Sequence, residues 1–289
     1  MTFRRLPAAL LVLAMAAVIL GLLGCGAGAT TTTTAAPAAT SGVPPTTATV
    51  ATIAPSASFS GQTLTVSAAQ SLMTVLTEFA TTFEKQTGAK ITYNFGSSGM
   101  LQKQIEGGAP VDVFASAAPD NIDALVKANL VDQASVAAFA GNDIVLAVPA
   151  TSTLGIASLA DLAKPDVKKV ATGDPAMAPH GKSAIEALTS LKLLDAVKPK
   201  LVYAANAAQT YDYVARGEVD AAILFYTDVY GKTDVKLVEK VPESSYKPVK
   251  YVVGVVTASK AKSLGQAFID GLLSPDGRAL FAKYGFKAP

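Results

Sequence analysis

The sequence predicts an α/β protein whose folded part, residues 62–289, is divided into two lobes. Segments with strand character alternate with segments of helical periodicity, which is the pattern of α/β layers with mostly parallel sheets. This alternation occurs in two blocks, with a change near Gly141-Asn142. The length of the folded part permits two lobes but not two large independent domains.

The first 24 residues are expected to be a signal peptide. Arg4 and Arg5 precede an apolar run from Leu6 to Leu23, and Gly24 then precedes Cys25. Cys25 is the single cysteine of the chain, and its place resembles the bacterial lipobox, in which the cysteine becomes the lipidated first residue of the mature protein. The alternative is an uncleaved transmembrane anchor, because the run is nearly long enough to span a bilayer.

Residues 25–61 are expected to form a tether. They consist mostly of Ala, Thr, Pro, Ser and Gly, with few large apolar residues. Such a segment buries too little surface to offset the entropy of ordering it, which predicts disorder. The same composition is compatible with an O-glycosylated stalk.

The composition of the folded part excludes several classes of protein. It contains no cysteine, so it has neither a disulfide framework nor a cysteine-based metal site. The chain has 24 basic and 22 acidic residues, and two of the basic ones, Arg4 and Arg5, lie in the leader, so the folded part is electrically balanced. Nucleic-acid binding requires a basic face and is therefore not expected. An anion would have to be held mainly by groups without net charge.

The first block alternates strands with helices. A helix is expected after Ser71, with apolar residues at helical spacing up to Phe83 and with Gly88 after its end. A short helix follows Ser97-Ser98 and stops at Gly107-Gly108, and another begins at Asp120. The expected strands are 64–66, 90–95 and 111–114.

The second block repeats this unit. It opens with the continuous apolar strand DIVLAV at 143–148. Helices are expected after Pro179-His180-Gly181 and after Asn206, and two more helices close the chain. The remaining expected strands are 170–172, 201–203, 221–226 and 251–256.

Four of these strand–loop–helix junctions have similar chemistry. They contain Ser71, the pair Ser97-Ser98, the stretch 179–181 and Asn206-Ala207. A helix start leaves backbone N–H groups unpaired and carries a partial positive charge. Such loops gather at the carboxyl ends of the strands, where open α/β sheets bind ligands. Together they would form a cage of neutral donors for a small anion. The alternative is that each Ser is only a helix cap.

Several segments of the sequence resemble the periplasmic molybdate-binding proteins. These segments are SAAQSL at 67–72, FGSSGMLQKQIEGGAPVDVFASA at 95–117, GNDIVLAVP at 141–149, GDPAMAPHG at 173–181, YTD at 226–228 and KYGF at 283–286. The most specific phrase, L-x-x-Q-I-E-x-G-A-P-x-D, runs from Leu101 to Asp112. The resemblance covers about 64–286. It implies the two-lobed type II periplasmic-binding-protein fold, with a ligand cleft between lobe 1 (62–142 plus 254–289) and lobe 2 (143–253).

The resemblance also implies a set of ligand-binding residues. Ser71 and Ser98 would bind an oxyanion through hydroxyl and N–H groups, and His180 and Ala207 would donate their backbone N–H groups. The imidazole of His180, the only histidine, could also contact the anion. The family's Tyr hydroxyl has no direct match, because Phe225 occupies its position. The neighbouring Tyr226 could replace it only after a register shift, since adjacent strand residues point to opposite faces.

The function implied by the resemblance is capture of molybdate, and of tungstate, for an ABC importer. The protein would be a monomer outside the cytoplasm, anchored to the membrane by lipid at Cys25, with the transporter permease as its partner. No catalytic residue, cofactor or protein–metal ligand is expected. The alternatives are binding of another oxyanion such as sulfate, a serine hydrolase that uses Ser98 with His180, and an adhesion or structural lipoprotein.

Overall fold

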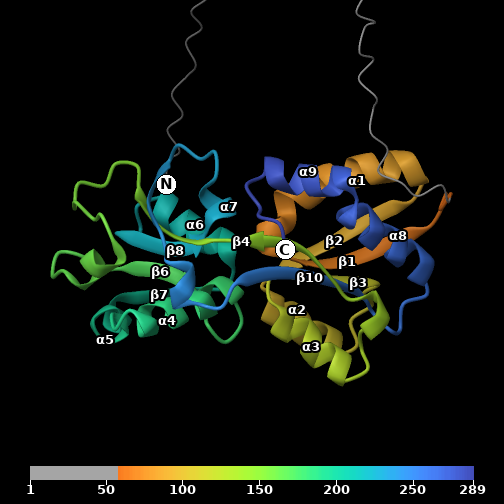
Figure 1. Ribbon diagram of the computed structural model, residues 1–289, viewed down its shortest axis with the longest axis horizontal. Helices are drawn as coiled ribbons and strands as arrows, with labels where there is room; N and C mark the ends of the chain where they lie inside the picture. The colour runs from red at the N-terminus through yellow and green to blue at the C-terminus, as the bar shows by residue number, and fades with distance from the viewer. Residues whose placement is uncertain (1–57) are drawn as a thin grey trace, which may run out of the picture. The chain divides into compact units, whose positions relative to one another are not determined.

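The computed structural model describes residues 58–289 (Figure 1). The expected signal peptide, Cys25 and most of the expected tether lie outside the described residues. The fold starts earlier than expected, because Phe59 is buried and its N–H donates to the Thr87 carbonyl at 2.7 Å. Every helix in the described part is too short or too polar to cross a lipid bilayer.

The first sheet forms the core of lobe 1. Its strand order is β2-β1-β3-β10-β4, with β1 parallel to β2 and β3, and β10 antiparallel to β3 and β4. Helices α1, α8 and α9 cover one face, and α2 and α3 cover the other (Figure 1). The bounds are β1 Thr63–Ala69, α1 Met73–Thr87, β2 Lys90–Gly96, α2 Ser98–Glu106, β3 Val113–Ser116, α3 Pro119–Lys127, β4 Ala137–Asn142, β10 Val249–Val255, α8 Lys262–Leu273 and α9 Pro275–Lys283.

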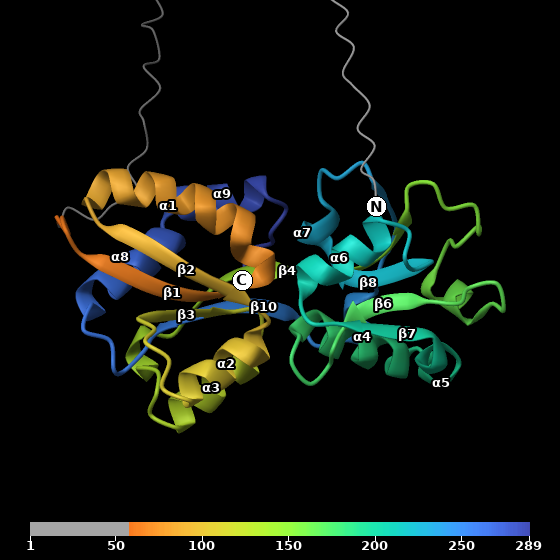
Figure 2. The same ribbon diagram turned by 180° about the vertical axis from the view of Figure 1, so that it is seen from behind.

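The second sheet forms the core of lobe 2. Its order is β7-β6-β8-β5-β9; β6 is parallel to β7 and β8, and β5 is antiparallel to β8 and β9. Figure 2 shows α6 and α7 on one face of this sheet and α4 and α5 on the other. The bounds are β5 Ile144–Pro149, β6 Val170–Gly173, α4 Pro179–Ser190, α5 Leu194–Val197, β7 Leu201–Ala204, α6 Ala207–Ala215, β8 Ala221–Phe225, α7 Tyr226–Val229 and β9 Val235–Lys240.

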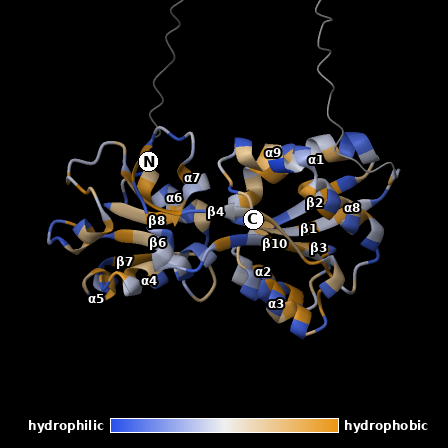
Figure 3. Cartoon of the chain, in the orientation of Figure 1, coloured by the Kyte–Doolittle hydropathy of each residue, from blue (hydrophilic) through white to orange (hydrophobic). Residues whose placement is uncertain are grey.

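Apolar side chains hold the helices against the sheets. In lobe 1, Phe79 and Phe83 of α1 pack against Phe268 of α8, with ring centroids 5.3 and 5.8 Å away. Burying one such ring contributes about 1.5–3 kcal/mol. Gly88 ends α1 in the left-handed conformation, at φ 74°, where a side chain would be strained. Figure 3 shows hydrophobic strands inside lobe 2 and an amphipathic α3.

The chain crosses between the lobes at two places in the described part. The first crossing joins β4 to β5 at Asn142 and Asp143. The second joins β9 to β10 and ends before Val249, which is earlier than the expected boundary after residue 253, because β10 pairs throughout with lobe 1 strands. The C-terminal segment stays with lobe 1, where Lys287 pairs with Gly141 of β4 through both backbone groups. Asp143, at the first crossing, accepts hydrogen bonds from Lys240 at the end of β9 and from Lys287, and so ties both crossings to the C-terminal segment.

Candidate functional site

Five of the six residues expected to bind ligand line one small cavity between the lobes. These five are Ser71, Ser98, His180, Ala207 and Phe225. The cavity has a volume of about 10 Å³, which is room for about one water molecule. The rest of its lining comprises Ala69, Gln70, Gly96, Ser97, Ala117, Ala178, Pro179 and Asn206. The lining holds no carboxylate, Lys or Arg from the described residues.

Three helices begin at this cavity. Ser98 is the first residue of α2, and Ala207 is the first residue of α6. Helix α4 begins with Pro179, whose fixed φ suits a first helical position, and His180 follows it. Among the described residues, no protein acceptor takes the N–H groups of Ser98, His180 and Ala207. These N–H groups and the helix dipoles give the cavity a positive potential without a charged side chain.

The serine hydroxyls at the cavity do not cap helices. Ser71 lies in the 3₁₀ turn Gln70–Leu72, ahead of α1, and its Oγ lies 2.9 Å from Tyr251 Oη. Ser98 Oγ accepts the N–H of Ala117 at 3.0 Å, which leaves its hydroxyl proton free to be donated. Ser97 Oγ is buried and has no partner among the described residues. The interpretation of these serines as caps is therefore not supported, and Ser97 adds a buried polar atom that a ligand could satisfy.

His180 is neutral and fixes the geometry of two loops. Its ring is buried, and its Nε2 lies 2.9 Å from Thr210 Oγ1. Because Thr210 donates its hydroxyl proton to the Asn206 carbonyl, it must accept from His180, so Nε2 carries the proton. Burial lowers the pKa of His180 to about 4. The side chain thus ties the start of α4 to the start of α6, and the backbone N–H remains the group available to an anion.

Phe225 faces the cavity, and Tyr226 does not line it. Tyr226 is the first residue of α7. The centroid of its ring lies 4.4 Å from Lys240 Nζ and 5.5 Å from the centroid of the Tyr230 ring. The ring of Phe225 lies 5.4 Å from that of His180. No register shift occurs at the end of β8, where Phe225 pairs with Ile144. This corrects the expectation that Tyr226 could supply a hydroxyl to the anion.

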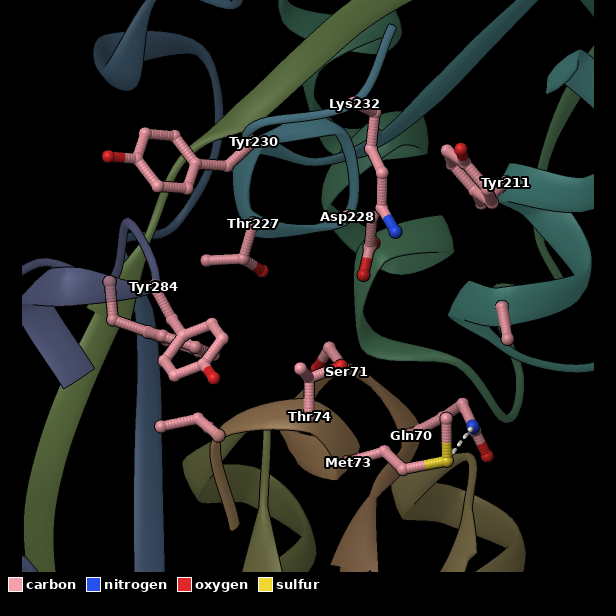
Figure 4. Close-up of a pocket in the computed structure, with 13 residues that line it drawn as sticks. Gln70, Ser71, Met73, Thr74, Tyr211, Thr227, Asp228, Tyr230, Lys232 and Tyr284 are labelled. Carbon is pink, nitrogen blue, oxygen red and sulfur yellow. Dashed lines mark hydrogen bonds between the residues drawn. The ribbon is translucent and has the colours of Figure 1, made fainter. Parts of the chain in front are cut away.

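A larger cavity adjoins the first. It has a volume of about 280 Å³ and shares Gln70 and Ser71 with the smaller one. Figure 4 shows Thr227, Asp228 and Lys232 of lobe 2 above Ser71 and Thr74 of lobe 1. Burial raises the pKa of Asp228 to about 7, and its Oδ2 is inaccessible and without a hydrogen-bond partner in the described part of the chain.

The two lobes touch directly beside the small cavity. The N–H of Gly99 in α2 donates to the carbonyl of Met177 in lobe 2 at 2.9 Å. Lys182 of α4 forms an ion pair with Asp120 of α3. This pair is exposed and contributes little to stability. These contacts describe a closed arrangement of the lobes.

The geometry does not support a serine hydrolase. In a catalytic triad the histidine must accept the proton of the serine hydroxyl. Here Nε2 of His180 carries a proton and donates it to Thr210, and no hydrogen bond joins Ser98 Oγ to the His180 ring in residues 58–289. Ser98 and His180 share a cavity but do not form a nucleophile–base pair.

Sequence reasoning missed three polar residues around the cavity. Thr210 lies behind His180, while Asn142 and Tyr251 lie behind Ser71. Tyr251 lies in an apolar strand pattern, and its hydrogen bond to Ser71 joins residues 180 positions apart, so no local pattern indicates it. At Asn142 the sequence indicates only the change from the first block to the second.

Comparisons with known proteins agree in family and fold. The sequence profile described as "Bacterial extracellular solute-binding protein" matches residues 64–287. Molybdate-binding protein ModA of Escherichia coli (strain K12) is 34% identical over 233 residues, covering 77% of this chain and 88% of that protein. YvgL of Bacillus subtilis (strain 168), whose name gives it provisionally as an ABC transporter substrate-binding lipoprotein, is 37% identical over 227 residues, covering 78% and 86%. The structure of the Azotobacter vinelandii periplasmic molybdate-binding protein superposes with a TM-score of 0.71 at 25% identity, covering 78% of this chain and 99% of that one.

Proposed function

The chain belongs to the bacterial extracellular solute-binding protein family, and we propose that it captures molybdate and tungstate for an ABC importer. The observation that carries this proposal is the convergence of Ser71, Ser98, His180 and Ala207 on one cavity, whose lining by described residues includes no charged side chain. Relatives named as molybdate-binding proteins support the choice of anion.

The binding mechanism follows from the donors at the cavity. A fully ionised oxyanion has only acceptors, and the cavity offers N–H groups at three helix starts together with serine hydroxyls from lobe 1. Ser71 and Ser98 belong to lobe 1, and His180 and Ala207 belong to lobe 2, so the anion bridges the lobes. Bound anion therefore stabilises the closed state relative to the open one. Because the cavity holds about one water molecule, the lobes must part to admit the anion and then settle around it.

Selectivity among oxyanions arises from the donor-only chemistry of the cavity and from its size. A protonated anion such as hydrogen phosphate needs an acceptor, and the small cavity is lined by no carboxylate from residues 58–289. Sulfate carries the same charge as molybdate but is smaller, so it leaves the donors at longer distances. Molybdate and tungstate have almost the same size and charge and should bind alike.

We also propose that the protein binds its ligand without catalysis, because Ser98 and His180 do not form a nucleophile–base pair. Lipidation at Cys25, docking to the transporter permease and the monomeric state remain proposals. They are supported by the leader sequence and by the family, whose relative YvgL carries the word lipoprotein in its name.

Calorimetric titration of the folded part with molybdate, tungstate, sulfate and phosphate tests this function. We expect micromolar or tighter binding for molybdate and tungstate only. Ser98→Ala should weaken molybdate binding by about 1.5–3 kcal/mol, because a donor to a charged ligand is lost. Ser135→Ala is the matched control; this buried serine bonds Asp132 and Val255 and does not line the cavity, so affinity should not change. Equal binding of all four anions would contradict the molybdate assignment.

A further inference from the structure

We propose that Tyr251 is a positioning residue that sets the direction of the Ser71 hydroxyl as a donor to the bound oxyanion, through a hydrogen-bond chain that begins at Asn142. This inference rests on the proposed function. It concerns a residue on β10, whose hydroxyl lies behind the cavity rather than in its lining.

Tyr251 is held rigidly. Its side chain is fully buried, and its ring contacts Phe139 of β4, Phe225 of β8 and Phe286 of the C-terminal segment, with centroids 6.1, 6.0 and 5.3 Å away. A ring enclosed by three others has a fixed hydroxyl position. That hydroxyl lies 2.9 Å from Ser71 Oγ and 3.0 Å from Asn142 Nδ2.

The direction of the chain is determined by its two ends. The amide nitrogen of Asn142 can only donate, so Tyr251 Oη accepts from it. At the other end, an ionised oxyanion can only accept, so Ser71 must give its proton to the anion. Between them, the Tyr251 hydroxyl proton must point to Ser71 Oγ. The order is therefore Asn142 to Tyr251 to Ser71 to anion, and each bond polarises the next.

The same amide reaches lobe 2. The second proton of Asn142 Nδ2 goes to Thr227 Oγ1 in α7, at 2.8 Å. Asn142 Oδ1 accepts the N–H of Asp143 at 2.9 Å, which fixes which atom of the amide is the nitrogen. Asn142 is the last residue of β4, where the chain first crosses between the lobes. The donor state of Ser71 is thus connected to the crossing and to lobe 2.

Two further observations support Tyr251 as a donor. Burial raises the pKa of Tyr251 far above its usual value, so the phenol keeps its proton at every physiological pH. Phe225, which occupies the position of the family's tyrosine, offers no hydroxyl to the cavity. In this chain a hydroxyl instead lies behind Ser71, 2.9 Å from its Oγ.

A double-mutant cycle tests this inference. Tyr251→Phe removes only the hydroxyl and should weaken molybdate binding by about three- to tenfold. In a Ser71→Ala background the same change should have no further effect, because the hydroxyl acts through Ser71. Tyr93→Phe is the matched control; Tyr93 donates to the Leu76 carbonyl at 3.0 Å in lobe 1, so its loss should lower the melting temperature but leave affinity unchanged.

A second variant covers the case in which Tyr251→Phe does not fold. Asn142→Asp replaces the donor by an acceptor, so Tyr251 would turn its proton away from Ser71, and binding should weaken by more than about tenfold. Wild-type affinity in Tyr251→Phe, or additive effects with Ser71→Ala, would overturn the inference while leaving the proposed function intact. Absence of oxyanion binding by the wild-type protein would overturn both.

Discussion

Substitution of Gly99 by alanine separates closure of the lobes from their folding. In the closed arrangement, a Cβ on Gly99 would lie 2.7 Å from the carbonyl oxygen of Met177 and 2.9 Å from its Cα. Both atoms belong to the backbone, so a flexible side chain cannot relieve the overlap. Forcing extra volume into a packed contact costs about 1–3 kcal/mol. In an open arrangement the overlap disappears, and Gly99, the second residue of α2, has no positive φ that would strain an alanine there.

We therefore expect Gly99→Ala to weaken molybdate binding by about 5- to 150-fold without lowering the melting temperature of the ligand-free protein. Calorimetry measures the first quantity and thermal unfolding the second. Gly107→Ala is the matched control, because Gly107 ends the same helix in an exposed position with an ordinary φ of −79° and does not contact lobe 2. If Gly99→Ala bound molybdate with wild-type affinity, the claim that Gly99 of lobe 1 contacts Met177 of lobe 2 in the anion-bound protein would be refuted.

Three further predictions concern the cavity and its surroundings. The folded protein keeps His180 neutral down to about pH 4, so it binds fewer protons than the unfolded chain between pH 6.5 and about pH 4. The free energy of unfolding should therefore fall by up to about 3 kcal/mol as the pH falls through this window. Denaturant titration of His180→Gln should lack this part of the loss. Asp228 should affect the pH dependence of stability in the opposite direction, because its raised pKa makes the folded state bind more protons than the unfolded chain between pH 3.8 and about pH 7. Asp228→Asn should therefore stabilise the protein by about 1–3 kcal/mol above this window and little below it. Equal shifts in melting temperature above and below the window would contradict a raised pKa for Asp228. Phe225→Tyr adds a hydroxyl at a wall of the cavity and should tighten molybdate binding several-fold. Calorimetry measures this change. Weaker binding would mean that the edge of the Phe225 ring does not face the anion.

Much of the fold could be predicted because its strands and helices differ in periodicity. The apolar runs of β5 and β8 and the helical stripe of α1 carry strong signals. Two strands were not predicted. β4 has the sequence AAFAGN, whose small residues carry little strand propensity, and β9 has VKLVEK, which is charged because it lies at the edge of its sheet. Both β4 and β9 form because they pair with a neighbouring strand, and the local sequence does not indicate this pairing.

The candidate site could be predicted only in part. Resemblance placed Ser71, Ser98, His180 and Ala207, and the structure brings them to one cavity. Periodicity alone could not decide whether the serines cap helices, because a cap and a ligand donor require the same residue type at the same place. The contacts of His180 with Thr210 and of Tyr251 with Ser71 depend on tertiary packing, so no local sequence pattern predicts them.

A crystal structure grown with molybdate, with the anomalous signal of molybdenum recorded, tests the central claim most directly. The claim is that a cavity with no charged side chain in its described lining holds the anion by dipoles from both lobes. We predict one molybdenum peak within hydrogen-bonding reach of Ser71, Ser98 and the N–H groups of His180 and Ala207. A peak elsewhere, or an anion held by a lysine or arginine, would contradict it.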